Sequence, residues 1–130
     1  MKDMRITVQA LSSAAGAFLG WFLGGLDGSV AALAMFTSAD VVTGVMCGIR
    51  NKNLSSEKSW PGISKKILTF IMVGVAHTID AYIIGEGQAF RMATVFFYLA
   101  HEGLSLVENA AIIGLPVPEK IKDALAQLRK

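Results

Sequence analysis

Residues 28–49 read GSVAALAMFTSADVVTGVMCGI, and Asp40 is the only charged residue among them. A helix rises about 1.5 Å per residue and the hydrocarbon core of a bilayer is about 30 Å thick, so about 20 apolar residues cross it. Residues 6–26 also reach that length, without a charged side chain, and residues 67–85 and 92–114 reach it with several ionisable ones. The sequence therefore predicts an all-α, polytopic membrane protein with four transmembrane helices.

The composition of the 130-residue chain also indicates a membrane protein, because 53% of its residues are hydrophobic, 17% are charged and its mean hydropathy is +0.52. Soluble domains carry about 25% charged residues. A secretory signal peptide is the alternative interpretation of the N-terminus, where Lys2 and Arg5 precede the apolar run. That run is longer than the usual signal core of about 7–15 residues. We therefore expect one transmembrane domain over residues 1–130.

The basic residues predict the orientation of the chain, because loops rich in Lys and Arg stay on the cytoplasmic side. All twelve except Arg91 lie where two cytoplasmic termini and one cytoplasmic loop would place them. The loop between the second and third predicted spans, polar over residues 54–64, fixes this topology through Arg50, Lys52, Lys58, Lys65 and Lys66. Residues 115–130 form a cytoplasmic tail, in which residues 118–130 fit a short amphipathic helix on the membrane surface or a solvated tail.

Ionisable and amide side chains inside the predicted spans are the candidate functional residues, because such groups are costly in a bilayer and normally face a bundle interior or water. No Lys or Arg lies within these spans, so only the two histidines are expected as counter-charges for the acids. One alternative is a hydrogen-bonded seam that only holds the helices together. We instead favour a face that becomes wetted when subunits assemble, lined by Asp40, His77, Asp80, His101, Glu102, Glu108 and Asn109.

Small residues recur every four positions along two of the predicted spans, a spacing that lets helix backbones approach closely in lipid. The pattern does not distinguish packing within one subunit from contacts between copies. The candidate packing residues are Ser12, Gly16, Gly20 and Gly24 on the first span, and Gly44 and Gly48 on the second.

Other classes of function find little support in the sequence. The segment that begins His101-Glu102 resembles the start of a zinc-protease helix, but the second histidine of that motif is missing. There is no glycine-rich phosphate loop and no paired-cysteine motif, and Cys47 is the only cysteine. The net charge of +2 follows from the topology, so no nucleic-acid partner is expected. We expect neither an enzyme nor a cofactor or metal.

Several short motifs together resemble the toxin-secretion and phage-lysis holin family. The most specific is HEGLSLVENAA at residues 101–111, followed by IIGLPVPEKIKDAL at 112–125. DVVTG at 40–44, NLSS at 53–56, GISKK at 62–66 and the stretch 77–80 are also similar to the family's pattern. The chain departs from that pattern at His101, where the family has Asn. The resemblance covers about residues 40–125.

The resemblance implies a protein that forms homo-oligomers in the host bacterial cytoplasmic membrane, in contact with membrane lipids. It implies pores or lesions that release or activate an endolysin, which need not contact the protein directly, and it implies no catalytic residues. An ion or proton channel and a non-conducting structural membrane protein fit the topology and the charges equally well, so they remain alternatives at this point.

Overall fold

The computed structural model describes residues 1–129, with the side chains of 125, 128 and 129 left aside, and these residues form helices joined by short turns. In chain order the elements are α1 (Lys2–Leu23), α2 (Gly28–Arg50), α3 (Ser56–Thr78), the π-helix η1 (Ile79–Ile84), α4 (Ala89–Ile113) and α5 (Glu119–Arg129). The predicted all-α class and short C-terminal helix are confirmed. The apolar face proposed for that helix depends on Leu125 and Leu128, which lie outside the described side chains.

Local sequence signals explain where the helices begin and end. Asp27 caps α2 by accepting a hydrogen bond from the Val30 amide at 3.1 Å, and Ser55 caps α3 by accepting one from the Lys58 amide at 3.2 Å. Such caps satisfy amides that have no partner within the helix. Gly24 ends α1 with a φ of +81°, a left-handed conformation that suits glycine. These signals place the turns between α1, α2 and α3.

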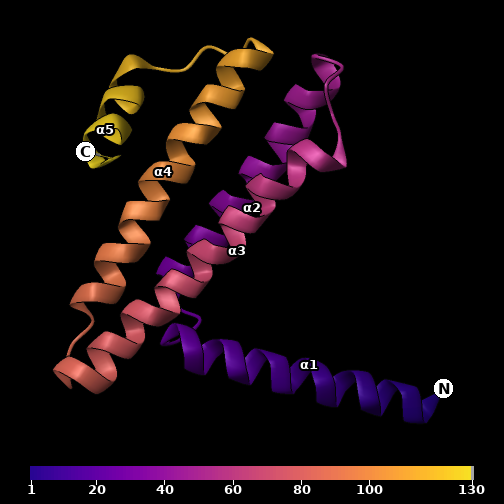
Figure 1. Cartoon of the computed structure of the whole chain (residues 1–130), viewed down its shortest axis with the longest axis vertical. Helices are drawn as coiled ribbons and strands as arrows, with labels where there is room; N and C mark the ends of the chain where they lie inside the picture. Colours follow the sequence, from indigo (N-terminus) through magenta and orange to yellow (C-terminus); the bar gives the residue numbers. More distant parts are fainter. Residues whose placement is uncertain (130) are drawn as a thin grey trace.

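The helices α2, α3 and α4 form a bundle, with α5 folded back beside the C-terminal half of α4 (Figure 1). The largest apolar side chains at its centre are Leu33, Val73 and Val95, one from each helix, and all three are fully buried. Tyr98 and Leu99 pack against this cluster. Burial of these side chains between the helices sets how α2, α3 and α4 face one another.

The helix α1 leaves this bundle at a steep inclination and touches it through its C-terminal turn (Figure 1). The ring of Phe22 lies where a side chain on Gly74 of α3 would have to lie, so glycine at that position permits the contact. Leu23 joins the core, whereas nearly all the preceding residues of α1 are exposed. In a bilayer this exposed surface would be covered by lipid or by another protein chain.

Three segments are long and apolar enough to cross a membrane: Lys2–Leu23, Gly28–Arg50 and the continuous helix Ser56–Ile84. The prediction of four such helices is therefore supported for three. The fourth, α4, is 25 residues long but is not among these segments, and it contains three charged side chains, Arg91, Glu102 and Glu108. The predicted loop at residues 54–64 is wrong in its extent, because the capped helix α3 already begins at Ser56.

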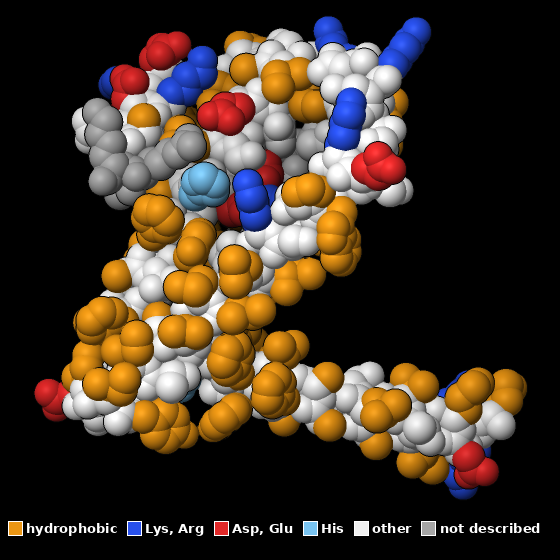
Figure 2. Space-filling view, in the orientation of Figure 1, with side chains coloured by type: hydrophobic (Ala, Val, Ile, Leu, Met, Phe, Trp, Pro, Cys, Tyr) orange, Lys and Arg blue, Asp and Glu red, His pale blue; other side chains and the backbone are white. Residues whose placement is uncertain are grey.

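Polar and apolar surfaces are separated along the bundle. Hydrophobic side chains dominate α1 and the end of the bundle that α1 contacts, whereas charged side chains gather near the opposite end, around the α2–α3 turn and α5 (Figure 2). We call the end near α1 the outer end and the end near the α2–α3 turn the inner end, following the predicted orientation.

Candidate functional site

Two layers of charged and polar side chains cross the bundle. The inner network consists of Asp40, Thr43, Lys66, Glu102 and Asn109, and the outer clamp consists of Asp27, Asp80 and Arg91. Lys66 and Asp80 belong to the same continuous helix and are 14 positions apart, which corresponds to about 20 Å along its axis. The buried apolar cluster lies between the two layers.

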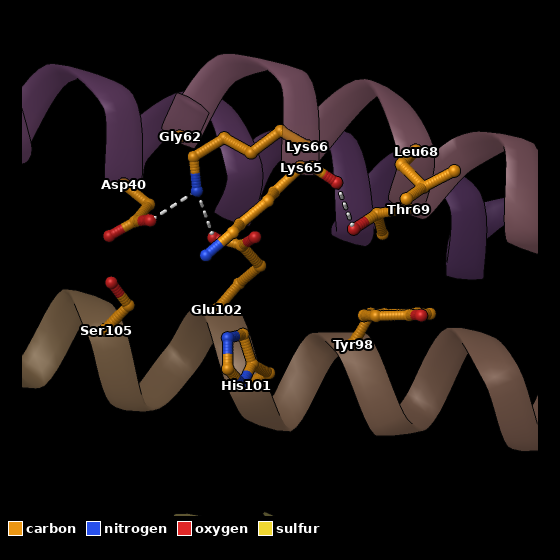
Figure 3. A pocket seen from close by; sticks show the side chains of 10 residues that line it. All are labelled: Asp40, Gly62, Lys65, Lys66, Leu68, Thr69, Tyr98, His101, Glu102 and Ser105. Carbon is orange, nitrogen blue, oxygen red and sulfur yellow. Dashed lines mark hydrogen bonds and ion pairs between the residues drawn. The ribbon is translucent and has the colours of Figure 1, made fainter. Parts of the chain in front are cut away.

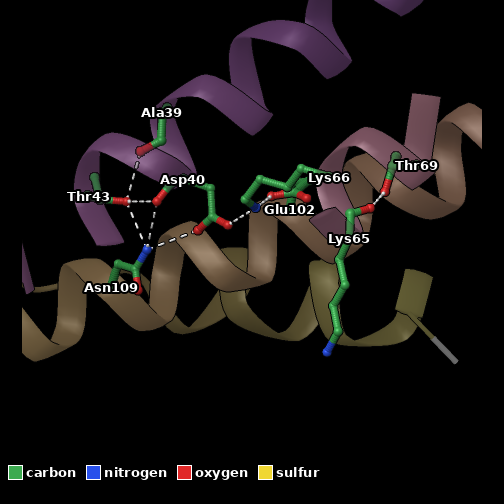
Figure 4. A network of polar contacts seen from close by, with 8 residues as sticks. All are labelled: Ala39, Asp40, Thr43, Lys65, Lys66, Thr69, Glu102 and Asn109. Carbon is green, nitrogen blue, oxygen red and sulfur yellow. Dashed lines mark hydrogen bonds and ion pairs between the residues drawn. The ribbon is translucent and has the colours of Figure 1, made fainter. Parts of the chain in front are cut away.

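At the inner network, one lysine joins two acids from different helices. The Lys66 ammonium group donates to Asp40 at 2.5 Å and to Glu102 at 2.8 Å (Figure 4). The Asn109 amide donates to the other carboxylate oxygen of Asp40 at 2.9 Å and to the Thr43 hydroxyl at 2.9 Å. Asp40 is 7% exposed and Glu102 is 4% exposed. Lys66 therefore compensates acids that would be costly to bury alone.

Two open hollows lie on either side of this network, each with a volume of about 320 Å³. Asp40, Gly62, Lys66 and Ser105 line both of them. Figure 3 shows the first hollow, where the Ser105 hydroxyl points toward Asp40 and the His101 ring stands beside Glu102. Polar cavities of this size hold water. The network thus lies between two hollows that water can enter.

At the outer clamp, Arg91 is fully buried and its guanidinium group satisfies acceptors from three directions. It donates to the Leu23 and Gly25 carbonyls of the α1–α2 turn, to Gln88 and to both oxygens of Asp27, at 2.8 and 3.2 Å. These bonds tie the start of α4 to the end of α1. The hydrogen bond from Arg91 holds the pKa of the Asp27 carboxyl well below its usual range.

Asp80 closes the clamp from the π-helix. Its carboxylate, in a residue only 1% exposed, accepts hydrogen bonds from the backbone amides of Phe90 at 3.1 Å and Arg91 at 2.8 Å. These amides belong to the first turn of α4, where they lack partners within the helix and where an anion is favoured. Asp80 is therefore a helix cap, supplied by a residue that precedes α4 in the chain.

The expectation that only histidines neutralise the intramembrane acids is wrong. Lys66 pairs with Asp40 and Glu102. The prediction missed this lysine because the predicted third span begins at residue 67, one position after it. Arg91 was excluded from the fourth span in the same way. A signal for both was present, since each is a basic residue next to a predicted span boundary. Their long side chains reach inward from there.

The remaining candidates fall into different surroundings. His77 is half-buried beside Gly24, where a side chain on that glycine would collide with its ring. His101 and Glu108 are exposed on α4. The structure thus gathers Asp40, Glu102 and Asn109 into one network but keeps His77 and Asp80 at the other end of the bundle.

The small residues differ in what surrounds them. Gly16 has no neighbour within 4 Å of where a side chain would begin, and at Gly20 the nearest atom belongs to Leu26 at 3.8 Å. Ser12 is exposed. Gly44 approaches Asn109, and Gly48 contacts Leu54. Close packing within the subunit therefore occurs at Gly24 and Gly48, whereas Ser12 and Gly16 are open.

The chemistry available at these layers is that of ion pairs, hydrogen bonds and water. Within residues 1–129, no three His, Cys, Asp or Glu side chains are grouped so as to hold a metal ion. The second hollow reaches from the inner network to Leu54, Lys58 and Ser59 near the inner end of the bundle. Apolar helices that enclose such a network define a membrane protein with a polar interior.

The chain belongs to the bacteriophage holin family, whose sequence model matches residues 17–130. It is 43% identical over 86 residues to a probable holin of Bacillus phage phi105, covering 66% of this chain and 63% of that one. It is 37% identical over 113 residues to an uncharacterised 14.9 kDa protein of Clostridium perfringens, covering 87% and 86%. It is also 39% identical over 110 residues to an uncharacterised Listeria monocytogenes protein, covering 85% and 78%. No solved structure matches.

Proposed function

We propose that this chain oligomerises in the cytoplasmic membrane of a bacterial host and opens lesions that allow an endolysin to reach the cell wall. The main structural support is the inner network, a cluster of charged side chains enclosed by apolar helices and flanked by two hollows. Buried ionised groups are retained in membrane helices at a cost, and they commonly mark paths for ions or water. Family membership supports this function, in which the chain itself catalyses no reaction.

We infer that α4 is the fourth span and that both termini face the cytoplasm. In support, α4 packs along α2, and the Arg50 side chain donates to the Ile113 carbonyl at 3.0 Å, so the C-terminal ends of the two helices lie together. The α2–α3 turn lies at this same end, and Arg50, Lys52 and Lys58 lie in it or within the adjoining helix turns. Fusion of reporter domains to residue 87 and to the C-terminus would test this topology, which requires opposite locations.

The exposed surface of α1 supports self-association. A helix whose apolar residues contact little of their own subunit offers Ser12 and Gly16 as a flat surface for another helix. In this proposal the subunits associate in part through α1, and the inner network becomes wetted in the assembled lesion. The endolysin would pass through the assembled lesion, and this passage requires no direct binding between the two proteins.

The decisive experiment expresses the chain in a bacterium that retains an active endolysin in its cytoplasm. We expect an abrupt fall in cell density, together with endolysin activity outside the membrane. Cells with the chain alone and cells with the endolysin alone serve as controls. Membrane depolarisation without enzyme release would identify a small ion or proton channel instead. No depolarisation and no release would identify a non-conducting structural protein.

A further inference from the structure

The helix α3 has a different place in the inner network from α2 and α4. The latter two are joined directly, since Asn109 of α4 donates to Asp40 and Thr43 of α2 and the Cys47 thiol of α2 donates to the Asn109 carbonyl. Among the described residues, Lys66 makes the only side-chain hydrogen bonds from α3 to either helix. The polar connection of α3 to α2 and α4 therefore depends on one side chain, whereas further along the same continuous helix Asp80 of η1 holds its outer end to α4.

The position of Lys66 also closes the space between the two hollows. Its ammonium group lies between Asp40 and Glu102, while Gly62, one turn earlier on α3, lines both hollows without a side chain to fill them. Displacing α3 would merge the two hollows into one cleft between α3 and the α2–α4 pair. Water already has access to both sides of the ion pairs, so this movement would not require charges to cross a dry layer.

The balance of charge makes the two arrangements distinct. With Lys66 in place, one ammonium group neutralises two nearby carboxylates in part, and the Asn109 amide satisfies another oxygen of Asp40. Without Lys66, both carboxylates would lose their cationic partner, and a partly buried charge without a partner is disfavoured unless more water reaches it. Separation of α3 and hydration of Asp40 and Glu102 would therefore occur together.

We propose that α3 is the moving gate of the subunit and that Lys66 is the residue that holds this gate closed. In the closed subunit Lys66 joins α3 to the α2–α4 pair. In the open subunit the inner half of α3 has moved away while Asp80 still holds the outer end of the same helix to α4, and Asp40 and Glu102 line a wetted path that favours cations. The gate rests on the proposed function for its biological meaning, but its opening is measurable in the absence of an endolysin.

Lys66→Met tests the gate, because methionine keeps an unbranched side chain while removing the charge. We expect cells that express this variant to lyse in less than half the time that the wild type needs. Lys65→Met is the matched control, because it removes the neighbouring charge from the same side of the membrane while leaving both ion pairs intact. We expect it to lyse on the wild-type schedule. Equal lysis times for the two variants would overturn the proposal.

The triple variant Lys66→Met with Asp40→Asn and Glu102→Gln separates loss of the gate from loss of a positive charge. If Lys66 acts through the two carboxylates, neutralising them removes the reason for hydration, and lysis is delayed relative to Lys66→Met alone. Lysis as early as that of the single variant would mean that Lys66 acts elsewhere. Membrane fractions probed with an antibody establish that all variants accumulate to the same level.

A labelling experiment measures the opening itself. A Ser105→Cys variant, made in a Cys47→Ala background so that it carries one thiol, places a reporter on both hollows. In inside-out vesicles a membrane-impermeant maleimide should label it at least fivefold faster when Lys66→Met is also present. Phe97→Cys, on the exposed apolar face of α4, is the control and should label slowly in both backgrounds. An unchanged rate at Ser105→Cys overturns the gate.

These measurements can contradict the gate without contradicting the proposed function, and the reverse. Accelerated labelling in a protein that never releases endolysin would support the gate and contradict the proposed release of endolysin. Endolysin release by a wild-type protein whose Lys66→Met and Lys65→Met variants behave alike would leave the function in place and remove the gate.

Discussion

Arg91 and Asp27 are 64 positions apart in sequence, yet the fully buried guanidinium group of Arg91 bonds both carboxylate oxygens of Asp27. Asp27 caps α2 and Arg91 lies in the first turn of α4, so this pair links the beginnings of two helices. Arg91 also holds the Leu23 carbonyl at the end of α1. The pair thus fixes the outer end of the bundle, where α1 is attached.

Asp27→Asn should lower the free energy of unfolding by about 1–3 kcal/mol, because the Arg91 charge stays buried after its anionic partner is lost. Asparagine caps helices about as well as aspartate, so the start of α2 is preserved. Ser29→Ala, which removes only the exposed hydroxyl bond to Asp27, should change stability by less than about 0.5 kcal/mol. Chemical unfolding in detergent micelles measures both. Equal losses would show that the ion pair contributes little.

The same pair predicts a pH dependence. The pKa of Asp27 is lowered in the folded protein by the Arg91 hydrogen bond, so its stabilising contribution is complete above the unfolded pKa of about 3.9 and is lost as pH falls through the folded value. The difference in thermal stability between the wild type and Asp27→Asn should therefore be constant at neutral pH and shrink below about pH 4. A difference that stays constant down to pH 3 would contradict this assignment.

Gly74→Ala should weaken the attachment of α1, because the new methyl group would occupy the space of the Phe22 ring. Forcing extra volume into a packed contact costs about 1–3 kcal/mol. The matched change is Gly16→Ala, which meets no atom within 4 Å and should leave the monomer at least as stable. If Gly16 instead lies in a contact between copies, Gly16→Ala weakens the oligomer, which chemical cross-linking in membranes would reveal.

Thr37 and Thr69 offer a second matched pair, since both are buried but only one hydroxyl is satisfied. Thr69 donates to the Lys65 carbonyl at 3.0 Å, whereas the Thr37 hydroxyl has no partner among the described residues. Thr37→Val should therefore stabilise the protein by about 1 kcal/mol, and Thr69→Val should destabilise it by a similar amount. Thermal unfolding of the two variants in one detergent gives the comparison. Destabilisation by Thr37→Val would point to a bound water at that hydroxyl.

Much of the helical architecture was predictable because apolar length and capping residues act locally. The second span, predicted at 28–49, corresponds to α2 within one residue, and the glycine at position 24 ends α1. Residues 54–64 were misassigned for a local reason too. Their polar composition suggested a loop, although Ser55 is a good helix cap and the charges suit a helix that emerges from lipid.

The sequence also identified Asp40, Glu102 and Asn109 as candidate site residues, because polar groups in apolar helices are conspicuous. It did not identify their partner. Lys66 lies at the edge of an apolar run, and composition alone assigns a lysine in that position to the loop. Its flexible four-carbon stem instead carries the charge into the bundle.

The membrane class, the all-helical fold and the presence of acids within apolar helices were predictable from the amino-acid sequence, because each follows from the cost of exposing polar groups to hydrocarbon. Which charges meet depends on the packing of the helices. The pairs Lys66–Asp40 and Arg91–Asp27 join different helices, and their formation depends on how the apolar faces of α2, α3 and α4 pack. The contacts at the end of α1 also depend on tertiary structure, since Phe22 packs on Gly74 and Arg91 bonds the Leu23 carbonyl.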